Sequence, residues 1–232
     1  MDFYTDVTTK LQKYLKDDQD LYNHLLRTAT SSKNISDYLM LSEPEKKMAF
    51  LIGLVYDIGK YINKDSITLL FEDKVIRKIM VEETYDDVIR DVIYFCNTNR
   101  IPEYYPDTIK AQINILRDSS RLEQLYLDTI KLDIVDSNPK VSAGFIKDFS
   151  MHKECNANEI KASFDRVILD LSYIFTFYSK YSLYTVEKEK YIAKIISNLH
   201  LSDNTSVELF KQLELILDKF IRDKIGEAYH GW

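Results

Sequence analysis

Residues 42–62 read SEPEKKMAFLIGLVYDIGKYI, and this stretch decides the fold. Ser42 followed by Glu45 has the pattern of a capping box, and Pro44 stands in the first turn, where helices tolerate it. The apolar run that follows is long enough to be buried on every side. The stretch therefore predicts a buried central helix against which other helices pack.

The rest of the chain has the same helical character. Its 232 residues include only 5 Gly and 4 Pro, whereas strand-rich folds need many turn residues. Apolar residues recur with helical periodicity almost throughout, which predicts an all-α fold. Besides the central helix, the expected helices span residues 2–16, 21–30, 69–81, 85–97, 108–117, 119–135, 139–149, 159–180, 186–199 and 205–228.

Charge, cysteine content and hydropathy limit the partners and the location. The formal net charge of −6 disfavours nonspecific binding to nucleic acid. The two cysteines, Cys96 and Cys155, have no paired spacing and suit a reducing compartment. The N-terminus shows no basic stretch followed by an apolar run, and no apolar stretch reaches the length of a membrane span. We therefore expect a cytoplasmic protein that does not cross a membrane.

Four features follow one another along the chain. They are His24 in YNHLLRTA, Asp57 in the stretch quoted above, Asn97 in YFCNTNRIPE, and the run INILRDSSRLEQL at 113–125. In this order they resemble the HD-superfamily phosphohydrolases, which carry an early His, a His-Asp pair in a motif like LLHDIGK, and a later Asp in a run like ILRDADKLD. The segment NEIKASFDRVILDLSYIFTFYSKYS also resembles the C-terminal helices of the bacterial branch of this family.

No repeat, low-complexity tract or long linker interrupts the chain, so we expect one HD-like helical domain over residues 1–232. Its HD core covers about residues 20–135, and a C-terminal helical extension covers about residues 136–232. The core of such a bundle can aim side chains from several helices at one point, which suits a metal site.

The resemblance also implies the ligands and the chemistry of that site. His24 and Asp57 match metal-ligand positions. Asp118, on the acidic position that precedes the last ligand, is the candidate for the late carboxylate, and Asp133 is the alternative. Imidazole and carboxylate groups suit Mn, Fe or Mg, and such an ion activates water for hydrolysis. In an active member, Asp57 and Lys60 would take part in catalysis.

Three positions depart from the family pattern. Tyr56 stands where the His of the His-Asp pair belongs, Ser120 where the last Asp belongs, and Cys96 where members often carry a His. A phenol with an ordinary pKa near ~10 stays neutral at pH 7, and a hydroxyl is a weaker ligand than a carboxylate. We therefore expect no tightly bound cofactor, and only a weakly held divalent metal if the protein is active.

These observations predict a degenerate HD-domain protein that binds rather than hydrolyses. Its ligand would be a nucleotide or another phosphate-containing small molecule, held by Arg27, Tyr56, Lys60 and Arg121, or else its surface would bind a protein partner. The alternative is an active metal-dependent phosphohydrolase acting on a nucleotide or phosphate ester. His24 also has a structural interpretation, as a core histidine whose hydrogen bonds are satisfied within the protein.

Overall fold

The computed structural model describes residues 2–16, 18–58, 86–98, 100–132, 140–201 and 203–227. Within these ranges the chain consists of helices joined by turns and contains no β-strand, so the predicted all-α class is confirmed. The helix predicted at 69–81 lies outside the described residues. The chain divides into two compact units, Met1–Glu123 and Gln124–Trp232.

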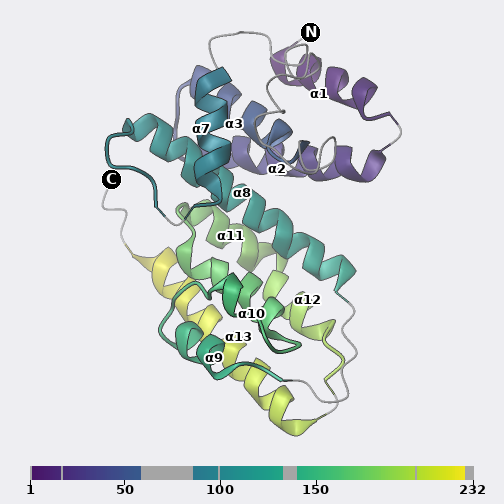
Figure 1. Cartoon of the computed structure of the whole chain (residues 1–232), viewed down its shortest axis with the longest axis vertical. Coiled ribbons are helices and arrows are strands. Elements are labelled where there is room, and N and C mark those ends of the chain that lie inside the picture. Colours follow the sequence, from purple (N-terminus) through teal and green to yellow (C-terminus); the bar gives the residue numbers. More distant parts are fainter. Residues whose placement is uncertain are drawn as a thin grey trace. The chain divides into compact units, whose positions relative to one another are not determined.

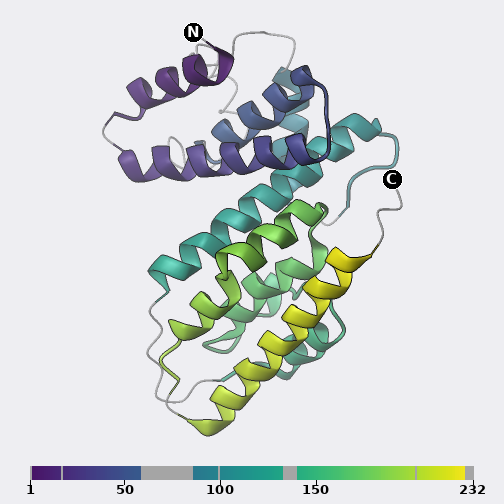
Figure 2. The same ribbon diagram turned by 180° about the vertical axis from the view of Figure 1, so that it is seen from behind.

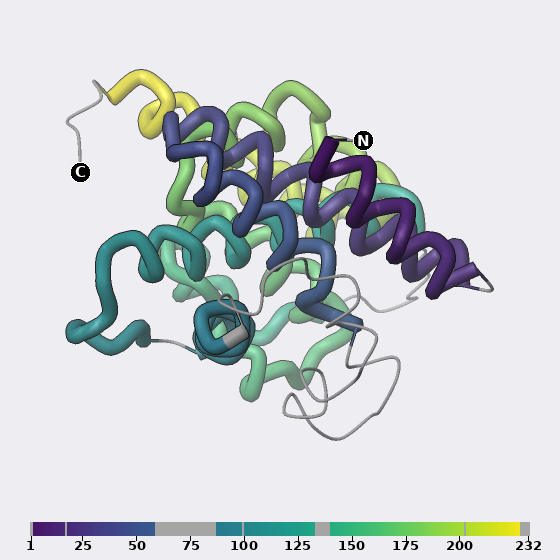
Figure 3. The backbone as a smooth tube through the Cα atoms, turned by 90° about the horizontal axis from the view of Figure 1, so that it is seen from above, coloured from purple at the N-terminus to yellow at the C-terminus, as the bar shows by residue number. Residues whose placement is uncertain are grey.

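Unit 1 is built around three N-terminal helices. Helices α2 (Gln19–Tyr38) and α3 (Glu43–Val55) run side by side, and α1 (Phe3–Tyr14) packs on both (Figures 1 and 3). Helix α7 (Asp86–Cys96) packs against α3. The last helix of the unit, α8 (Asp107–Lys131), continues past the unit boundary.

The predicted central helix is α3. The Glu45 carboxylate accepts hydrogen bonds from the Ser42 backbone N–H at 2.9 Å and from the Ser42 hydroxyl at 2.6 Å. These contacts fix the start of the helix, as the capping-box pattern predicted. Every residue from Ala49 to Val55 is buried. The helix therefore occupies the core of unit 1, with apolar side chains around its whole circumference.

Helices α2 and α3 approach each other most closely at Gly53. A Cβ atom added there would lie 2.8 Å from the Ala29 Cα and 2.8 Å from the Ser32 hydroxyl oxygen. Such distances are shorter than van der Waals contact, so only glycine fits between the two backbones. The Ser32 hydroxyl in turn donates to the Ser119 hydroxyl at 2.9 Å, which links α2 to α8 inside the core.

Two predicted helix bounds in unit 1 are wrong. Helix α2 was expected to end at residue 30 but continues to Tyr38, starting from the Asp18 cap. Helix α8 was expected to break at 117–119 but is continuous. Ser119 donates back to the Ile115 carbonyl, and Ser120 to the Arg117 carbonyl. Both serines thus satisfy their hydroxyls within the helix and do not end it.

Unit 2 contains the remaining helices and two short 3-10 turns. They are α9 (Ala143–Ser150), η2 (Ala157–Glu159), α10 (Asp165–Ser172), η3 (Tyr173–Thr176), α11 (Lys180–Glu189), α12 (Tyr191–Ser197) and α13 (Asn204–Gly226). Helix α13 runs along α11, and α12 packs on both (Figure 2). Aromatic rings pack in the core of unit 2. The ring centroids of Phe164 and Phe210, which meet edge to face, are 5.3 Å apart, and those of Phe149 and Phe175 are 4.8 Å apart.

Two more helix predictions are corrected in unit 2. The helix expected at 159–180 starts only at Asp165, because the Asp165 carboxylate accepts hydrogen bonds from the backbone N–H groups of Lys161 and Ala162 and so holds that segment in a turn. The helix expected at 186–199 is two helices, α11 and α12. They meet at Lys190, whose φ of 55° is left-handed and ends the helical hydrogen-bond ladder.

Candidate functional site

The candidate site lies in unit 1, where four helices contribute polar side chains. His24 and Arg27 are three residues apart on α2 and therefore share a face. Tyr56 and Asp57 lie in the turn that ends α3, Cys96 ends α7, and Glu123 comes from α8. Tyr56, Asp57 and Glu123 surround the His24 ring, and Cys96 lies near it.

His24 is held at both ring nitrogens. Its Nε2 lies 3.1 Å from Asp57 Oδ2, and its Nδ1 lies 3.1 Å from Glu123 Oε1. Burial alone lowers the pKa of His24, but the hydrogen bonds to Asp57 and Glu123 outweigh it and raise the pKa to about 9. The ring is therefore protonated at neutral pH, and each N–H donates to one carboxylate.

Glu123 also binds Arg27. The Arg27 Nε lies 2.9 Å from Glu123 Oε2, and its terminal nitrogen lies 2.7 Å from Oε1. The Glu123 side chain is only 2% exposed, whereas that of Arg27 is 36% exposed. Two cations and two carboxylates thus form one network, in which the charge of Arg27 is matched by Glu123. The contact that the sequence predicts between Arg27 and a ligand stays a prediction.

Tyr56 occupies the space beside His24. Its hydroxyl lies 3.4 Å from His24 Nε2 and is also hydrogen-bonded to Asp57. Burial and the neighbouring Asp57 carboxylate raise the pKa of the Tyr56 hydroxyl well above its usual value. The phenol is therefore neutral and acts as a donor to the Asp57 carboxylate.

Cys96 and Ser120 meet near this network. Burial raises the pKa of the Cys96 thiol to about 11, although Arg117, a hydrogen bond to Ser120 and Arg121 each lower it. The Cys96 side chain is half-buried. Arg117 is held by the carbonyls of three residues, Phe95, Cys96 and Thr98. Two guanidinium groups therefore act on the region around Cys96.

The predicted site residues divide into three groups. His24 and Asp57 lie together as expected, with Tyr56, Cys96 and Ser120 near them. Asp118 is buried on α8, but it is five residues from Glu123, which places it about 140° around the helix from the side chain that reaches His24. Lys60 and Asp133 lie outside the described residues.

Glu123 is the site residue that the sequence analysis missed. It stands in the quoted run INILRDSSRLEQL, where the resemblance gives it no role. Its position on the helix carried a signal, because Leu116, Ser119 and Glu123 follow one another on the buried face of α8. A glutamate on a buried helix face needs a cationic partner, and α2 carries two candidates.

The donors present do not form a full metal site in the described ranges. No group of three or more His, Cys, Asp and Glu side chains with a suitable arrangement occurs among them. His24 and Asp57 could supply two donors to an ion on the Nε2 side of the ring, and Tyr56 would have to move away from it.

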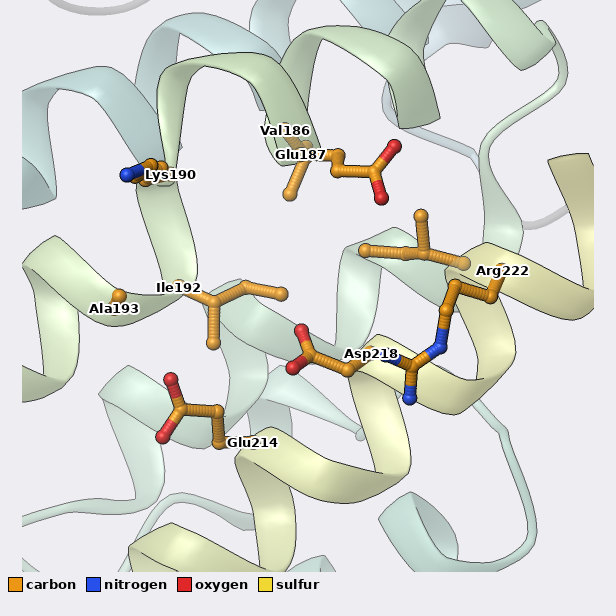
Figure 4. Close-up of a pocket in the computed structure, with 9 residues that line it drawn as sticks. Val186, Glu187, Lys190, Ile192, Ala193, Glu214, Asp218 and Arg222 are labelled. Atoms are coloured by element: carbon orange, nitrogen blue, oxygen red, sulfur yellow. The ribbon is translucent and has the colours of Figure 1, made fainter.

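Unit 2 contains a separate pocket of about 230 Å³ between α11, α12 and α13. Val186, Ile192 and Ile221 form its apolar floor. Its charged residues are Glu187, Lys190, Glu214, Asp218 and Arg222, seen as sticks in Figure 4. Charges of both signs line it, so the pocket favours no one class of ligand.

Comparison of the chain with models of known families, with curated proteins and with solved structures gives no match. Among the described helices, none combines the length and the hydrophobicity that a membrane crossing requires.

Proposed function

We propose that the chain is a degenerate HD-type protein that binds a phosphate-bearing small molecule, such as a nucleotide, and does not hydrolyse it. The observation that carries this proposal is the position of His24 between two carboxylates, Asp57 on one ring nitrogen and Glu123 on the other. The resemblance to the HD superfamily remains an inference from the sequence.

The geometry at His24 favours binding over catalysis. A metal that activates water normally needs at least three protein ligands and open positions for water. Here Asp57 lies against the Nε2 side of His24, and the neutral Tyr56 hydroxyl is 3.4 Å from the same nitrogen. Ser120 donates its hydroxyl to a backbone carbonyl and brings no negative charge. A divalent ion would have to displace these contacts.

The cations of α8 support a phosphate-bearing ligand. Arg117 and Arg121 are four residues apart and therefore share a face of the helix. Both lower the pKa of the Cys96 thiol, so their positive potential reaches this part of the site. Guanidinium groups bind phosphate oxygens with paired, charge-assisted hydrogen bonds.

Metal analysis and hydrolysis assays test the first half of the proposal. The protein purified without chelator should contain no stoichiometric Mn, Fe, Ni or Zn, and hydrolysis of nucleotides and phosphodiesters should stay near background. The double substitution Tyr56→His with Ser120→Asp should raise metal affinity. One equivalent of metal in the unmodified protein, together with a phosphatase activity lost in Asp57→Asn, would overturn it.

Calorimetric titration with ADP and with inorganic phosphate tests the second half. We expect Arg121→Gln to weaken binding about tenfold or more, since a hydrogen bond to a charged group contributes roughly 1.5–3 kcal/mol. Arg90→Gln, an exposed arginine of α7, is the matched control and should bind as the unmodified protein does. If neither ADP nor inorganic phosphate binds, the proposal of a phosphate-bearing ligand is wrong.

The second candidate is an active metal-dependent phosphohydrolase. What favours it is the pairing of His24 with Asp57 at 3.1 Å, the arrangement that the resemblance implies for two metal ligands. In that case Asp118 or Asp133 would supply a further carboxylate, and Lys60 would lie close to the reacting phosphate.

A further inference from the structure

Two aspartates of unit 2 interact with each other. Asp128 lies near the C-terminal end of α8, and Asp170 lies on α10. Asp170 is only 2% exposed. A carboxylate with so little water around it requires partners that replace its hydration.

Each aspartate of this pair accepts a hydrogen bond from a neighbouring side chain. Asp170 Oδ2 accepts from Arg166 Nε at 2.9 Å, and Asp128 Oδ1 accepts from the Gln124 amide at 2.9 Å. The two carboxyl groups also lie close enough to interact with each other. Within the described ranges, no N–H or hydroxyl group donates to the buried Asp170 Oδ1.

A hydrogen bond between two carboxyl groups needs a proton. Ionised carboxylates only accept, so two of them in contact repel each other unless one is protonated. Arg166 holds Asp170 in its ionised form, because the guanidinium bonds directly to that side chain. Asp128 has an amide partner but no ion pair of its own within the described residues, which makes it the side chain that carries the proton.

We propose that Asp128 and Asp170 share one proton, with Asp128 as donor and Asp170 as acceptor, and that losing this proton loosens the end of α8 from α10. The proton passes to solvent and leaves two carboxylates facing a single guanidinium. Their repulsion then acts directly between the two helices.

The electrostatic surroundings agree with this geometry. Burial and the Asp170 charge raise the pKa of Asp128 to about 7, although Gln124 and Arg166 lower it. Burial also raises the pKa of Asp170, although Arg166 and the bond from Asp128 lower it. The titratable Tyr173 also acts on Arg166. The transition should therefore fall near neutral pH.

Carbon-13 NMR titration of the aspartate carboxyl groups in the full chain tests the shared proton. Asp128 should titrate near pH 7 in the unmodified protein. In Asp170→Asn, which removes the neighbouring charge, the Asp128 midpoint should move down towards the ordinary aspartate value of about 3.9. An Asp128 midpoint near 4 in the unmodified protein would overturn the proposal.

Hydrogen exchange tests the effect on the helices. Protection of the backbone amides of residues 124–131, corrected for intrinsic rates, should fall by up to about tenfold per pH unit above pH 7, the limit for one linked proton. In Asp128→Asn protection should stay level, because the amide can still donate to Asp170 and does not titrate. Asp223→Asn, the matched control on α13, should behave like the unmodified protein.

A parallel loss of protection in the unmodified protein and in Asp128→Asn would show that the shared proton does not hold the helices together. If Asp128→Asn does not fold, the carboxyl titration of the unmodified protein still decides whether the proton is shared.

Discussion

At His24 a single side chain links three helices of unit 1. Asp57 follows α3, Glu123 belongs to α8, and His24 itself lies on α2, so the imidazole ring crosslinks all three through two hydrogen bonds of 3.1 Å. The resemblance to the HD superfamily predicts a metal ion at this position. Here the same residue types hold each other in place.

Replacing the buried carboxylate at the centre of this network should cost stability. Glu123→Gln keeps the shape but removes the charge that faces His24 and Arg27, so we expect the free energy of unfolding to fall by about 1–3 kcal/mol. The lower part of this range is expected because Arg27 is partly exposed. Urea denaturation measures the change. The exposed Glu103, replaced in the same way, should lose less than about 0.5 kcal/mol.

The protonation of His24 should make stability depend on pH. Its pKa is raised from 6.5 to about 9 in the folded chain, so the folded state holds the proton more tightly than the unfolded state. The contribution to the free energy of unfolding is full below pH 6.5 and is lost as pH rises towards 9. Denaturation at pH 6, 7.5 and 9 should show this decline, and His24→Gln should lack it. Equal slopes in both proteins would contradict the assignment.

The pairing of His24 with Asp57 could be predicted from the sequence, whereas the role of Glu123 could not. The family pattern assigns residues by their order along the chain, which identified the two expected ligands. Glu123 contacts His24 across 99 residues of sequence. Its partner became clear only when the faces of α2 and α8 were both known.

At the level of the helices, close packing of α2 against α3 is the dominant feature. Gly53→Ala should lower the free energy of unfolding by about 1–3 kcal/mol, because the new methyl group would lie 2.8 Å from the backbone of Ala29. The better helix propensity of alanine offsets roughly 1 kcal/mol of this at most. Gly144→Ala is the control, since its Cβ first meets Glu159 at 3.6 Å. An unchanged Gly53→Ala midpoint in urea would show that the helices can move apart freely.

The presence of a helix was easier to predict than the residues at which it begins and ends. The capping box at Ser42 was recognisable because both of its residues are close in sequence. The turn before Asp165 was not, since its carboxylate also binds the backbone and the hydroxyl of Ser142, 23 residues earlier. The left-handed Lys190 gave no signal either, because lysine is an ordinary helix residue.

For the whole molecule, the division into two units falls inside a helix. Domain boundaries usually lie in linkers rich in Pro, Gly or polar residues. Here the boundary after Glu123 lies within α8, and the sequence EQLYL around it keeps its helical periodicity. The end of the HD core was therefore predicted near residue 135, because nothing in the sequence marks the earlier division.

A cavity made in the core of one unit should lower the stability of that unit and leave the other unchanged. Leu25→Ala, at a fully buried position of unit 1, should destabilise that unit by roughly 2–5 kcal/mol. Hydrogen exchange followed by mass spectrometry should then accelerate in peptides of α2 and α3. Peptides around Phe164 and Phe210 in unit 2 should keep their protection. Uniform acceleration in both units would show that they unfold as one.

The close approach at Gly53 has an evolutionary consequence. A position that only glycine can occupy is set by the packing of the backbone, so we expect the glycine to persist while function changes around it. Ligand positions can drift, but a lineage that keeps these two helices in contact must keep glycine at this point. Distant relatives of this chain should therefore be sought by a glycine in the middle of the central helix, opposite a small residue such as Ala29, before any search for a His-Asp pair.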